Sequence, residues 1–122
     1  EVRGESMGVV ILFLQIILGV AFFIAGIGKL TNARMYVNAF RRWRLPQSFR
    51  LVVGSLEVFA SVLLFAGVFS ELFLTFGALI LVGISVGGIL VHLSVKDRIQ
   101  EMLPIIILGS LAFILLLIGG IG

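Results

Sequence analysis

The chain is organised as four long apolar runs separated by shorter polar segments. The runs cover about residues 8–30, 51–69, 72–93 and 102–121. Each is close to the ~20 residues that a helix needs to cross the hydrocarbon core of a bilayer. Because the connections are short, successive spans should run in opposite directions. The pattern predicts an all-α fold, an integral membrane antiparallel four-helix bundle in which residues 1–122 form a single transmembrane domain.

The segment "TNARMYVNAFRRWRLPQSFR" between the first two runs has a different pattern. Tyr36, Phe40 and Trp43 recur at the spacing of one helix face, and Arg41 falls on another side. This predicts an interfacial amphipathic helix over about residues 33–45, ended by the following proline. The four side chains named here would anchor the bundle at headgroup level. The alternative is that this helix forms a lid over the entrance to a pocket.

The composition agrees with a membrane protein. Of the 122 residues, 61% are hydrophobic and 12% are charged, and the mean hydropathy is +1.29, whereas soluble proteins are about half apolar and about a quarter charged. The net charge of +3 fits arginines that meet anionic lipid headgroups, since no nucleic-acid-binding module is recognisable. The chain has no cysteine, which excludes disulfides, thiolate catalysis and iron–sulfur ligation by its own residues.

The distribution of basic residues predicts the orientation in the membrane. All but one of the nine lysines and arginines lie at or in the connections after the first and third runs, and the exception is Arg3. Both connections should therefore be cytoplasmic and both termini outside, in a prokaryotic cytoplasmic membrane. The first residues, "EVRGES", lack an initiator methionine; they are either a processed end or non-native residues before a native start at Met7.

Three ionisable residues lie within or at the ends of the apolar runs. A charge in the hydrocarbon costs about 2.5–3.5 kcal/mol on insertion scales, so each needs a partner or a use. Lys29 ends the first run, Glu57 lies ~10 Å into the second at ~1.5 Å per residue, and His92 ends the third. The alternating directions of the runs place all three in the cytoplasmic half of the membrane.

Small and polar residues share helix faces with these three side chains. Such faces are the ones that membrane helices turn toward one another, so we expect Lys29, Glu57 and His92 to form one polar site. The supporting residues are Gln15, Gly26, Asn32, Gly54, Ser61, Ser85 and Gly88.

A carboxyl, an imidazole and an ammonium among phenylalanines are suited to binding a quinone headgroup and exchanging protons with it. One histidine and one glutamate are too few for a zinc site, and a second axial histidine for haem is absent. The sequence thus predicts no metal and no covalent cofactor. The structural alternatives are a snorkelling Lys29, a Lys29–Glu57 ion pair that only holds the bundle together, and a His92 that satisfies its own hydrogen bonds.

The stretches "FFIAGIGKLTN", "LVVGSLEVFASVLLFAG" and a third run ending in "VHL" resemble the DoxX-like family of small integral membrane proteins. The resemblance runs from about Leu18 to the last span. It implies a shared polar site at Lys29, Glu57 and His92. Some relatives are associated with redox complexes, the namesake being similar to a small subunit of a thiosulfate:quinone oxidoreductase, and eukaryotic relatives look like membrane chaperones. Some members carry cysteines, and this chain departs from them.

These observations predict a quinone-contacting or accessory subunit of a membrane redox complex that is not a complete enzyme alone. The alternative is a membrane chaperone or assembly protein, with structural polar residues and an outward partner-binding face at Gly83 and Gly87. A carrier is disfavoured, because four short spans without an inverted repeat leave little room for alternating access. The partner, which is a redox protein or another membrane protein, the ligand and homo-oligomerisation stay open.

Overall fold

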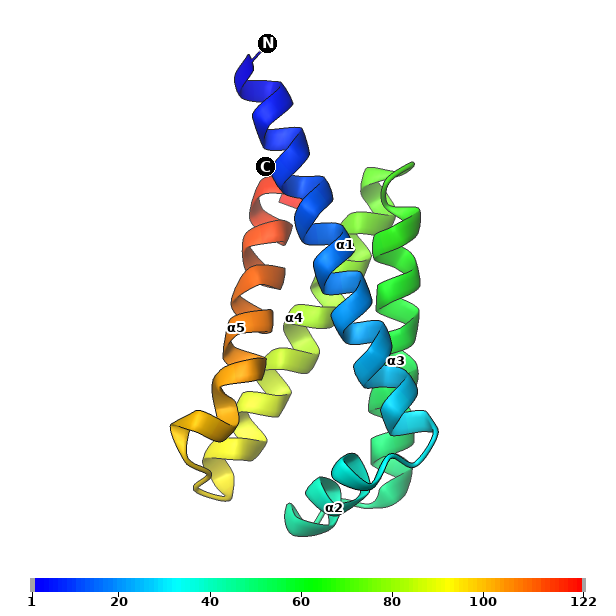
Figure 1. Ribbon diagram of the computed structural model, residues 1–122, viewed down its shortest axis with the longest axis vertical. Coiled ribbons are helices and arrows are strands. Elements are labelled where there is room, and N and C mark those ends of the chain that lie inside the picture. The colour runs from blue at the N-terminus through cyan, green and yellow to red at the C-terminus, as the bar shows by residue number, and fades with distance from the viewer. Residues whose placement is uncertain (1, 122) are drawn as a thin grey trace.

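The computed structural model describes residues 2–121, and every regular element among them is a helix (Figure 1). Each of the four apolar runs forms one long helix, and a short helix follows the first. The elements are α1 (Val2–Leu30), α2 (Arg34–Arg42), α3 (Gln47–Ala66), α4 (Glu71–Ser94), α5 (Ile99–Leu115) and a π-helical end, η1 (Leu116–Ile121).

Four helical segments are long and apolar enough to cross a membrane: Glu5–Leu30, Gln47–Ala66, Glu71–Ser94 and Ile99–Gly120. Large apolar side chains project outward from all of them, among them Phe13, Phe59, Leu90 and Ile107. An apolar surface of this extent is unfavourable in contact with water, whereas lipid tails are themselves apolar and can cover it. The chain is an integral membrane protein.

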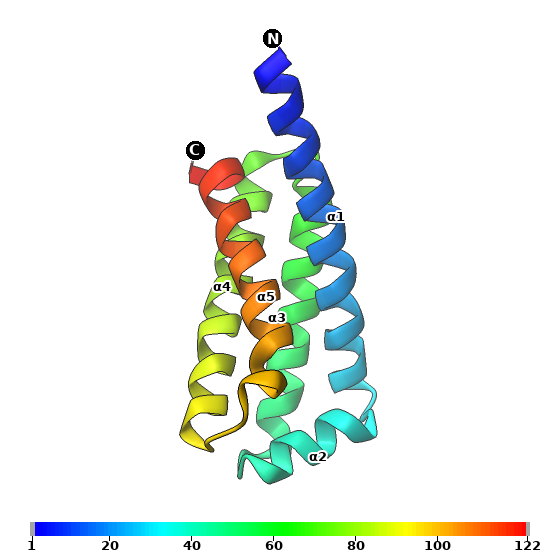
Figure 2. The ribbon, with the colours of Figure 1, turned by 60° about the vertical axis from the view of Figure 1, so that its left-hand side comes forward.

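The helices pack in the order α1 against α3, α3 against α4 and α4 against α5 (Figures 1 and 2). Both chain ends and the turn at residues 67–70 lie at one end of the molecule, which we call the terminal end. Helix α2 crosses the opposite end, which we call the α2 end. The connection between α4 and α5 also lies there.

Some helix bounds differ from the hydropathy pattern. Helix α3 begins at Gln47, before the apolar run near residue 51, and α5 begins at Ile99 instead of residue 102. Pro104 consequently lies inside α5. The reason is that hydropathy reports which residues suit lipid, while a helix continues into polar residues until a backbone signal stops it. Pro46, with extended backbone, is that signal before α3.

Three helices finish in the same way at the α2 end. Asn32, Arg44 and Lys96 follow α1, α2 and α4 with φ of 62°, 61° and 58°. In each case the next backbone N–H donates to the carbonyl five residues earlier, at 2.9, 3.0 and 3.0 Å. This is the Schellman arrangement, which pairs the last carbonyls of a helix and turns the chain sharply. It sets the direction of every connection at this end.

Candidate functional site

Lys29 and Glu57 form a buried ion pair between α1 and α3. Nζ of Lys29 lies 2.9 Å from Oε1 of Glu57, and the two side chains are 11% and 4% exposed. Two glycines bring the helices together here: a Cβ on Gly26 would lie 2.8 Å from the carbonyl oxygen of Gly54, and a Cβ on Gly54 would lie 2.8 Å from Cβ of Lys29. The sequence pattern of small residues therefore creates the contact that joins the pair.

The Glu57 carboxylate is not fully satisfied by this contact. Among the described residues, its Oε1 is the buried side-chain polar atom that has no hydrogen-bond partner. The contact with Lys29 is thus a close approach of charges without the angles of a hydrogen bond. Oε1 itself is enclosed by protein, so the nearby charge of Lys29 is what stabilises this carboxylate.

Tyr36 of α2 covers the ion pair. Nζ of Lys29 lies 4.1 Å from the centroid of the Tyr36 ring, a cation–π contact. Gly28 makes room for this ring, because a Cβ there would lie 2.7 Å from a Tyr36 ring carbon. Burial, and after it the negative charge of Glu57, raise the pKa of the Tyr36 phenol. The phenol therefore stays neutral and keeps its O–H.

His92 does not contact the ion pair; its partner is Asp97, in the connection after α4. His92 Nδ1 lies 2.7 Å from Oδ2 of Asp97, and Trp43 packs edge-on against the imidazole, with 5.1 Å between ring centroids. Of the three residues expected to form one polar site, Lys29 and Glu57 thus pair with each other, and His92 has a different partner.

Asp97 also binds α2. Arg42 donates a hydrogen bond to its Oδ1, and Trp43 Nε1 lies 3.4 Å from its Oδ2. The Arg42 hydrogen bond, helped by those from His92 and Trp43, outweighs the effect of burial and holds the pKa of Asp97 below its usual range. We call Arg42, Trp43, His92 and Asp97 the Asp97 cluster. It ties the end of α2 to the α4–α5 connection.

A cavity of about 640 Å³ lies between these groups, and all five α-helices line it. Its ionisable or hydroxyl-bearing lining residues include Lys29, Tyr36, Glu57 and His92. Its volume is within the 300–1,000 Å³ or so that is typical of small-molecule sites. The three residues predicted to converge therefore share one cavity, although only Lys29 and Glu57 touch. Apolar side chains that form its walls include Phe22, Phe40, Leu56, Ile84, Ile105 and Leu108.

The aromatic face of α2 points into this cavity. Phe40 is only 3% exposed, and its ring packs 5.2 Å from that of Trp43 and 6.4 Å from that of Phe49. Of the four predicted anchors, Tyr36, Phe40 and Trp43 line the cavity, whereas Arg41 is exposed. This is the placement that a lid over the cavity requires.

The supporting residues divide into two groups. Gly26 and Gly54 form the close helix contact, Gly88 lines the cavity, and Asn32 accepts a hydrogen bond of 2.9 Å from Arg50. All four lie next to the predicted site.

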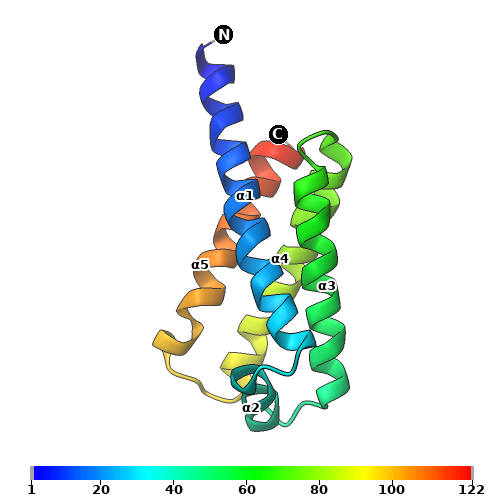
Figure 3. The same cartoon turned by 45° about the vertical axis from the view of Figure 1, so that its right-hand side comes forward.

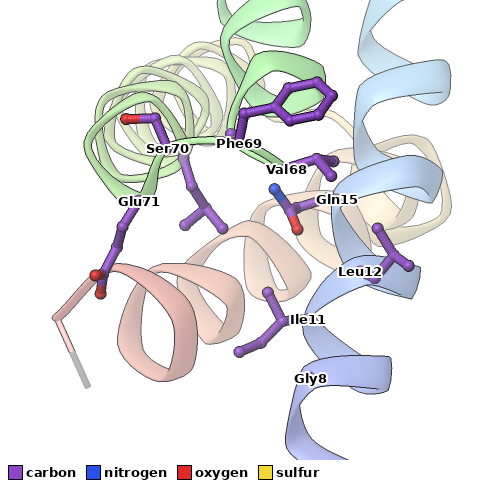
Figure 4. A pocket seen from close by; sticks show the side chains of 10 residues that line it. Gly8, Ile11, Leu12, Gln15, Val68, Phe69, Ser70 and Glu71 are labelled. Atoms are coloured by element: carbon purple, nitrogen blue, oxygen red, sulfur yellow. The ribbon is translucent and has the colours of Figure 1, made fainter.

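The other three serve the backbone. Ser61 and Ser85 donate to carbonyls of their own helices, at 2.8 and 2.7 Å, as hydroxyls in membrane helices commonly do. Gln15 donates to the Leu64 carbonyl at 3.1 Å. It lies near the terminal end, in the wall of a separate pocket of about 370 Å³. Figure 4 shows Gln15 and Ile11 of α1 facing residues 68–71 there. Gln15 is therefore not part of the Lys29–Glu57 site.

Sequence reasoning missed two residues that organise the site. Arg50 is 5% exposed and donates to the backbone carbonyl of Lys29, to Asn32, and to Gln47 at 2.7 Å. In the sequence Arg50 is only one of several basic residues near a connection, whereas in the fold it joins α3 to the Lys29 carbonyl at the end of α1. Asp97 was missed because its partners are far away in sequence. In the part of the chain that the structure describes, no group of three or more His, Asp and Glu could hold a metal ion.

The fold and the cavity define a small polytopic helical membrane protein with a partly polar intramembrane cavity. The model of the DoxX-like family matches residues 13–115, so the chain belongs to this family. No curated protein and no solved structure matches it.

Proposed function

We propose that this protein binds a lipid-soluble quinone in the 640 Å³ cavity and acts as a quinone-contacting or accessory subunit of a membrane redox complex. The observation that carries the proposal is the combination, in one cavity, of apolar walls with Lys29, Glu57 and His92. An apolar cavity with a few convergent polar groups suits a flat ring that bears polar oxygens and an apolar tail.

In the proposed arrangement the spans form an antiparallel bundle, and α2 lies at the cytoplasmic interface with both termini outside, in a prokaryotic cytoplasmic membrane. The support is electrostatic: the described basic residues of α2 and of the three connections at that end are Arg34, Arg41, Arg42, Arg44, Lys96 and Arg98. An excess of Lys and Arg marks cytoplasmic segments. The cavity then lies in the cytoplasmic half, with α2 as its cover.

The roles of the side chains follow from their chemistry. Lys29 and Tyr36 carry N–H and O–H groups that a ligand oxygen can accept. Glu57 and His92 are able to take up and release protons near the ligand. The rings of Phe40 and Trp43 stack on or beside an aromatic headgroup. Electrons would pass between the bound ligand and a partner subunit.

Trp43 offers a direct test, because it is the chain's single tryptophan and it lines the cavity. Purified protein in lipid nanodiscs is titrated with short-chain ubiquinone and menaquinone analogues, and quenching of Trp43 fluorescence should saturate. Lipid extraction and mass spectrometry should also find quinone enriched in the wild type over Glu57→Gln. Linear, non-saturating quenching together with no enrichment would overturn the proposal.

A matched pair of glycine variants separates binding in the cavity from partition into lipid. A Cβ added at Gly87 or at Gly8 meets no atom within 4 Å, so both positions accept a side chain. Gly87 lines the cavity, whereas Gly8 lies by the pocket at the terminal end. Gly87→Val should weaken quinone binding about tenfold or more, because the added side chain fills part of the cavity. A tenfold change in affinity corresponds to ~1.4 kcal/mol. Gly8→Val should leave it unchanged.

One observation favours the second candidate, a chaperone or assembly protein. Gly83 and Gly87 lie four residues apart on α4 with open space at each Cβ. They line the cavity instead of the predicted outward face, so a partner would have to enter there. Four residues is the spacing at which membrane helices dock closely, and a partner helix or a second copy of the chain would suit it. Under this alternative, Gly83→Leu abolishes co-purification of a membrane partner, while Lys29→Met combined with Glu57→Gln is tolerated and no quinone binds.

A further inference from the structure

The polar contacts between the two halves of the bundle are confined to one place. We call α1, α2 and α3 the first half, and α4, α5 and η1 the second half. Among the described residues, every hydrogen bond or ion pair that joins the halves runs from Arg42 or Trp43 to Asp97 or Glu101. Asp97 binds both Arg42 and Trp43, and the Arg42 guanidinium also lies 3.6 Å from Glu101. All these contacts lie at the α2 end.

Each half is itself tightly joined. In the first half, Gly26 and Gly54 bring α1 and α3 together. In the second half, a Cβ on Gly109 of α5 would lie 2.7 Å from Cβ of Ser85 on α4. Helix α2 belongs to the first half, because its two connections lead to α1 and α3. A separation of the halves would therefore carry α2 along with α1 and α3.

The other end of the bundle provides a hinge. The chain passes from the first half to the second through the turn at residues 67–70, at the terminal end (Figure 1). Next to it lies the solid core, where Gly77 of α4 packs against the backbone of α3 at Ala60 and where Leu18 and Leu81, one from each half, are completely buried. The halves are thus joined by covalent structure and close packing at one end, and by polar contacts at the other.

The residues that join the halves at the α2 end also close the cavity. Trp43, His92 and Glu101 are among its lining residues, and the rings of Trp43 and His92 meet edge-on with 5.1 Å between centroids. The Asp97 carboxylate holds both rings, since His92 Nδ1 lies 2.7 Å and Trp43 Nε1 3.4 Å from its Oδ2. Removing this carboxylate would release the two rings from one anchor.

We propose that α2 is a hinged lid and that the Asp97 carboxylate is its latch. When the contacts of Asp97 with Arg42 and Trp43 break, the first half swings away from the second about the solid core, and the cavity opens to water at the α2 end. Local opening takes place where the fewest packed apolar contacts are lost, and lids of this kind control how fast ligands enter and leave. The inference concerns access to the cavity and does not depend on the identity of the ligand.

The outer side of the lid fits an opening toward water. A charged side chain prefers water or lipid headgroups to hydrocarbon, so a helix end that carries exposed arginines lies at the aqueous surface. The exposed basic residues of α2 and the two residues that follow it are Arg34, Arg41, Arg42 and Arg44.

Thiol labelling measures the opening directly, because the chain has no cysteine of its own. Gly87→Cys places a single reporter in open space in the cavity wall. The protein in lipid nanodiscs is treated with a charged, water-soluble methanethiosulfonate, and mass spectrometry follows the rate of labelling, which is proportional to the open population when opening is fast. The reporter should react at least about tenfold more slowly than in protein unfolded by detergent.

Two substitutions break the latch from opposite sides. In the reporter background, Asp97→Asn and Arg42→Ala should each raise the labelling rate about tenfold, the equivalent of ~1.4 kcal/mol. Arg42 is half-exposed, so its loss leaves the fold intact. The two substitutions together should exceed either alone by less than about threefold, because both break the same contact.

Two controls accompany these variants. Arg41→Ala makes the same change at the neighbouring exposed residue, outside the Asp97 cluster, and should leave the labelling rate of Gly87→Cys unchanged. A second reporter, Gly8→Cys, lies by the pocket at the terminal end. Its labelling rate should not respond to Asp97→Asn, because the hinge stays closed.

Three results would overturn the latch. The first is wild-type labelling as fast as in the unfolded protein, since the cavity would then be open without any release. The second is an unchanged rate in both Asp97→Asn and Arg42→Ala. The third is an equal acceleration at Gly8→Cys, which would mean that the substitutions loosen the whole bundle. None of these measurements uses a quinone, so a failure of the latch is distinguishable from a failure of the proposed function.

Discussion

The same four long helices build a solid core toward the terminal end and a cavity toward the α2 end. Leu18, Leu64, Leu81 and Leu115 are completely buried and fill the first region. In the second, the α1–α3 pair and the α4–α5 pair separate (Figure 3), and a cavity of about 640 Å³ lies between them. The difference between the two regions comes from how closely the helices approach.

The glycines of α4 illustrate this difference. A Cβ on Gly77 would lie 3.0 Å from the carbonyl oxygen of Ala60, so this glycine lets α3 and α4 meet. Gly83 and Gly87, one and a half to three turns further on, have no atom within 4 Å of a Cβ, and both line the cavity. A residue type that permits close packing at one level thus leaves room for a ligand at another.

The solid core also separates the two pockets. Leu18, at 0% exposure, lies on α1 between Gln15 in the terminal-end pocket and Phe22 in the wall of the cavity. A carrier needs a site reached from both sides in turn. The packing of this layer gives no support to the carrier alternative.

The largest expected effect tests the solid core. Leu64→Ala should lower the free energy of unfolding by about 3 kcal/mol, because it opens a void among residues that cannot collapse into it. Leu108→Ala, in the wall of the cavity, should cost less than about 1.5 kcal/mol, since the space beside it is already open. Denaturant unfolding in micelles measures both. Equal losses would mean that the two halves are packed alike.

The second effect tests the ion pair. Lys29→Met should cost about 3 kcal/mol at neutral pH, because it leaves the buried Glu57 without its counter-charge. Adding Glu57→Gln should recover most of that loss. A double-mutant cycle gives the coupling energy, and a coupling near zero would mean that the pair does not hold α1 and α3 together.

A third, smaller effect tests the tether of α2. Because the folded pKa of Asp97 is lowered, its stabilising contribution is complete above the usual aspartate pKa of about 3.9 and is lost as the pH falls through the lowered folded value. The protection factors of the α2 amides, which correct hydrogen exchange for its intrinsic pH dependence, should therefore be unchanged from neutral pH to about pH 5 and fall in stronger acid. Asp97→Asn should lower these protection factors already at pH 7.

Arg41 provides the control for the tether, since it is exposed on the same helix and outside the Asp97 cluster. Arg41→Ala should leave the exchange of α2 at its wild-type rate. If Asp97→Asn behaved like Arg41→Ala, the cluster would not be what holds α2 against the α4–α5 connection.

The smallest effect concerns the turns at the α2 end. Lys96 has φ of 58°, a conformation that costs a side-chain-bearing residue about 1–2 kcal/mol, while glycine loses about 0.5–1 kcal/mol through the entropy of the unfolded chain. Lys96→Gly should therefore raise thermal stability by about 0.5 kcal/mol net. A loss of stability would show that the Lys96 side chain makes a contribution beyond the turn.

The sequence by itself determined the four spans, the family and the level of the three ionisable residues. These properties depend on hydropathy along the chain and on the ~1.5 Å rise per residue of a helix, both of which are local. The pairing of Lys29 with Glu57 was also within reach, because Gly26 and Gly54 are small residues beside the two charges. Gln15 was misplaced because a shared helix face does not imply a shared depth: 14 residues separate it from Lys29, or ~21 Å.

Only the tertiary structure decided which groups meet. His92 binds Asp97 because the turn at Lys96 folds the chain back onto the end of α4, and Arg42 arrives from a helix 55 residues away. Whether a small-residue face closes on a neighbour or borders a cavity depends on how far the helices separate. That separation is set by the packing of all the helices together, so it cannot be predicted from the sequence of any single span.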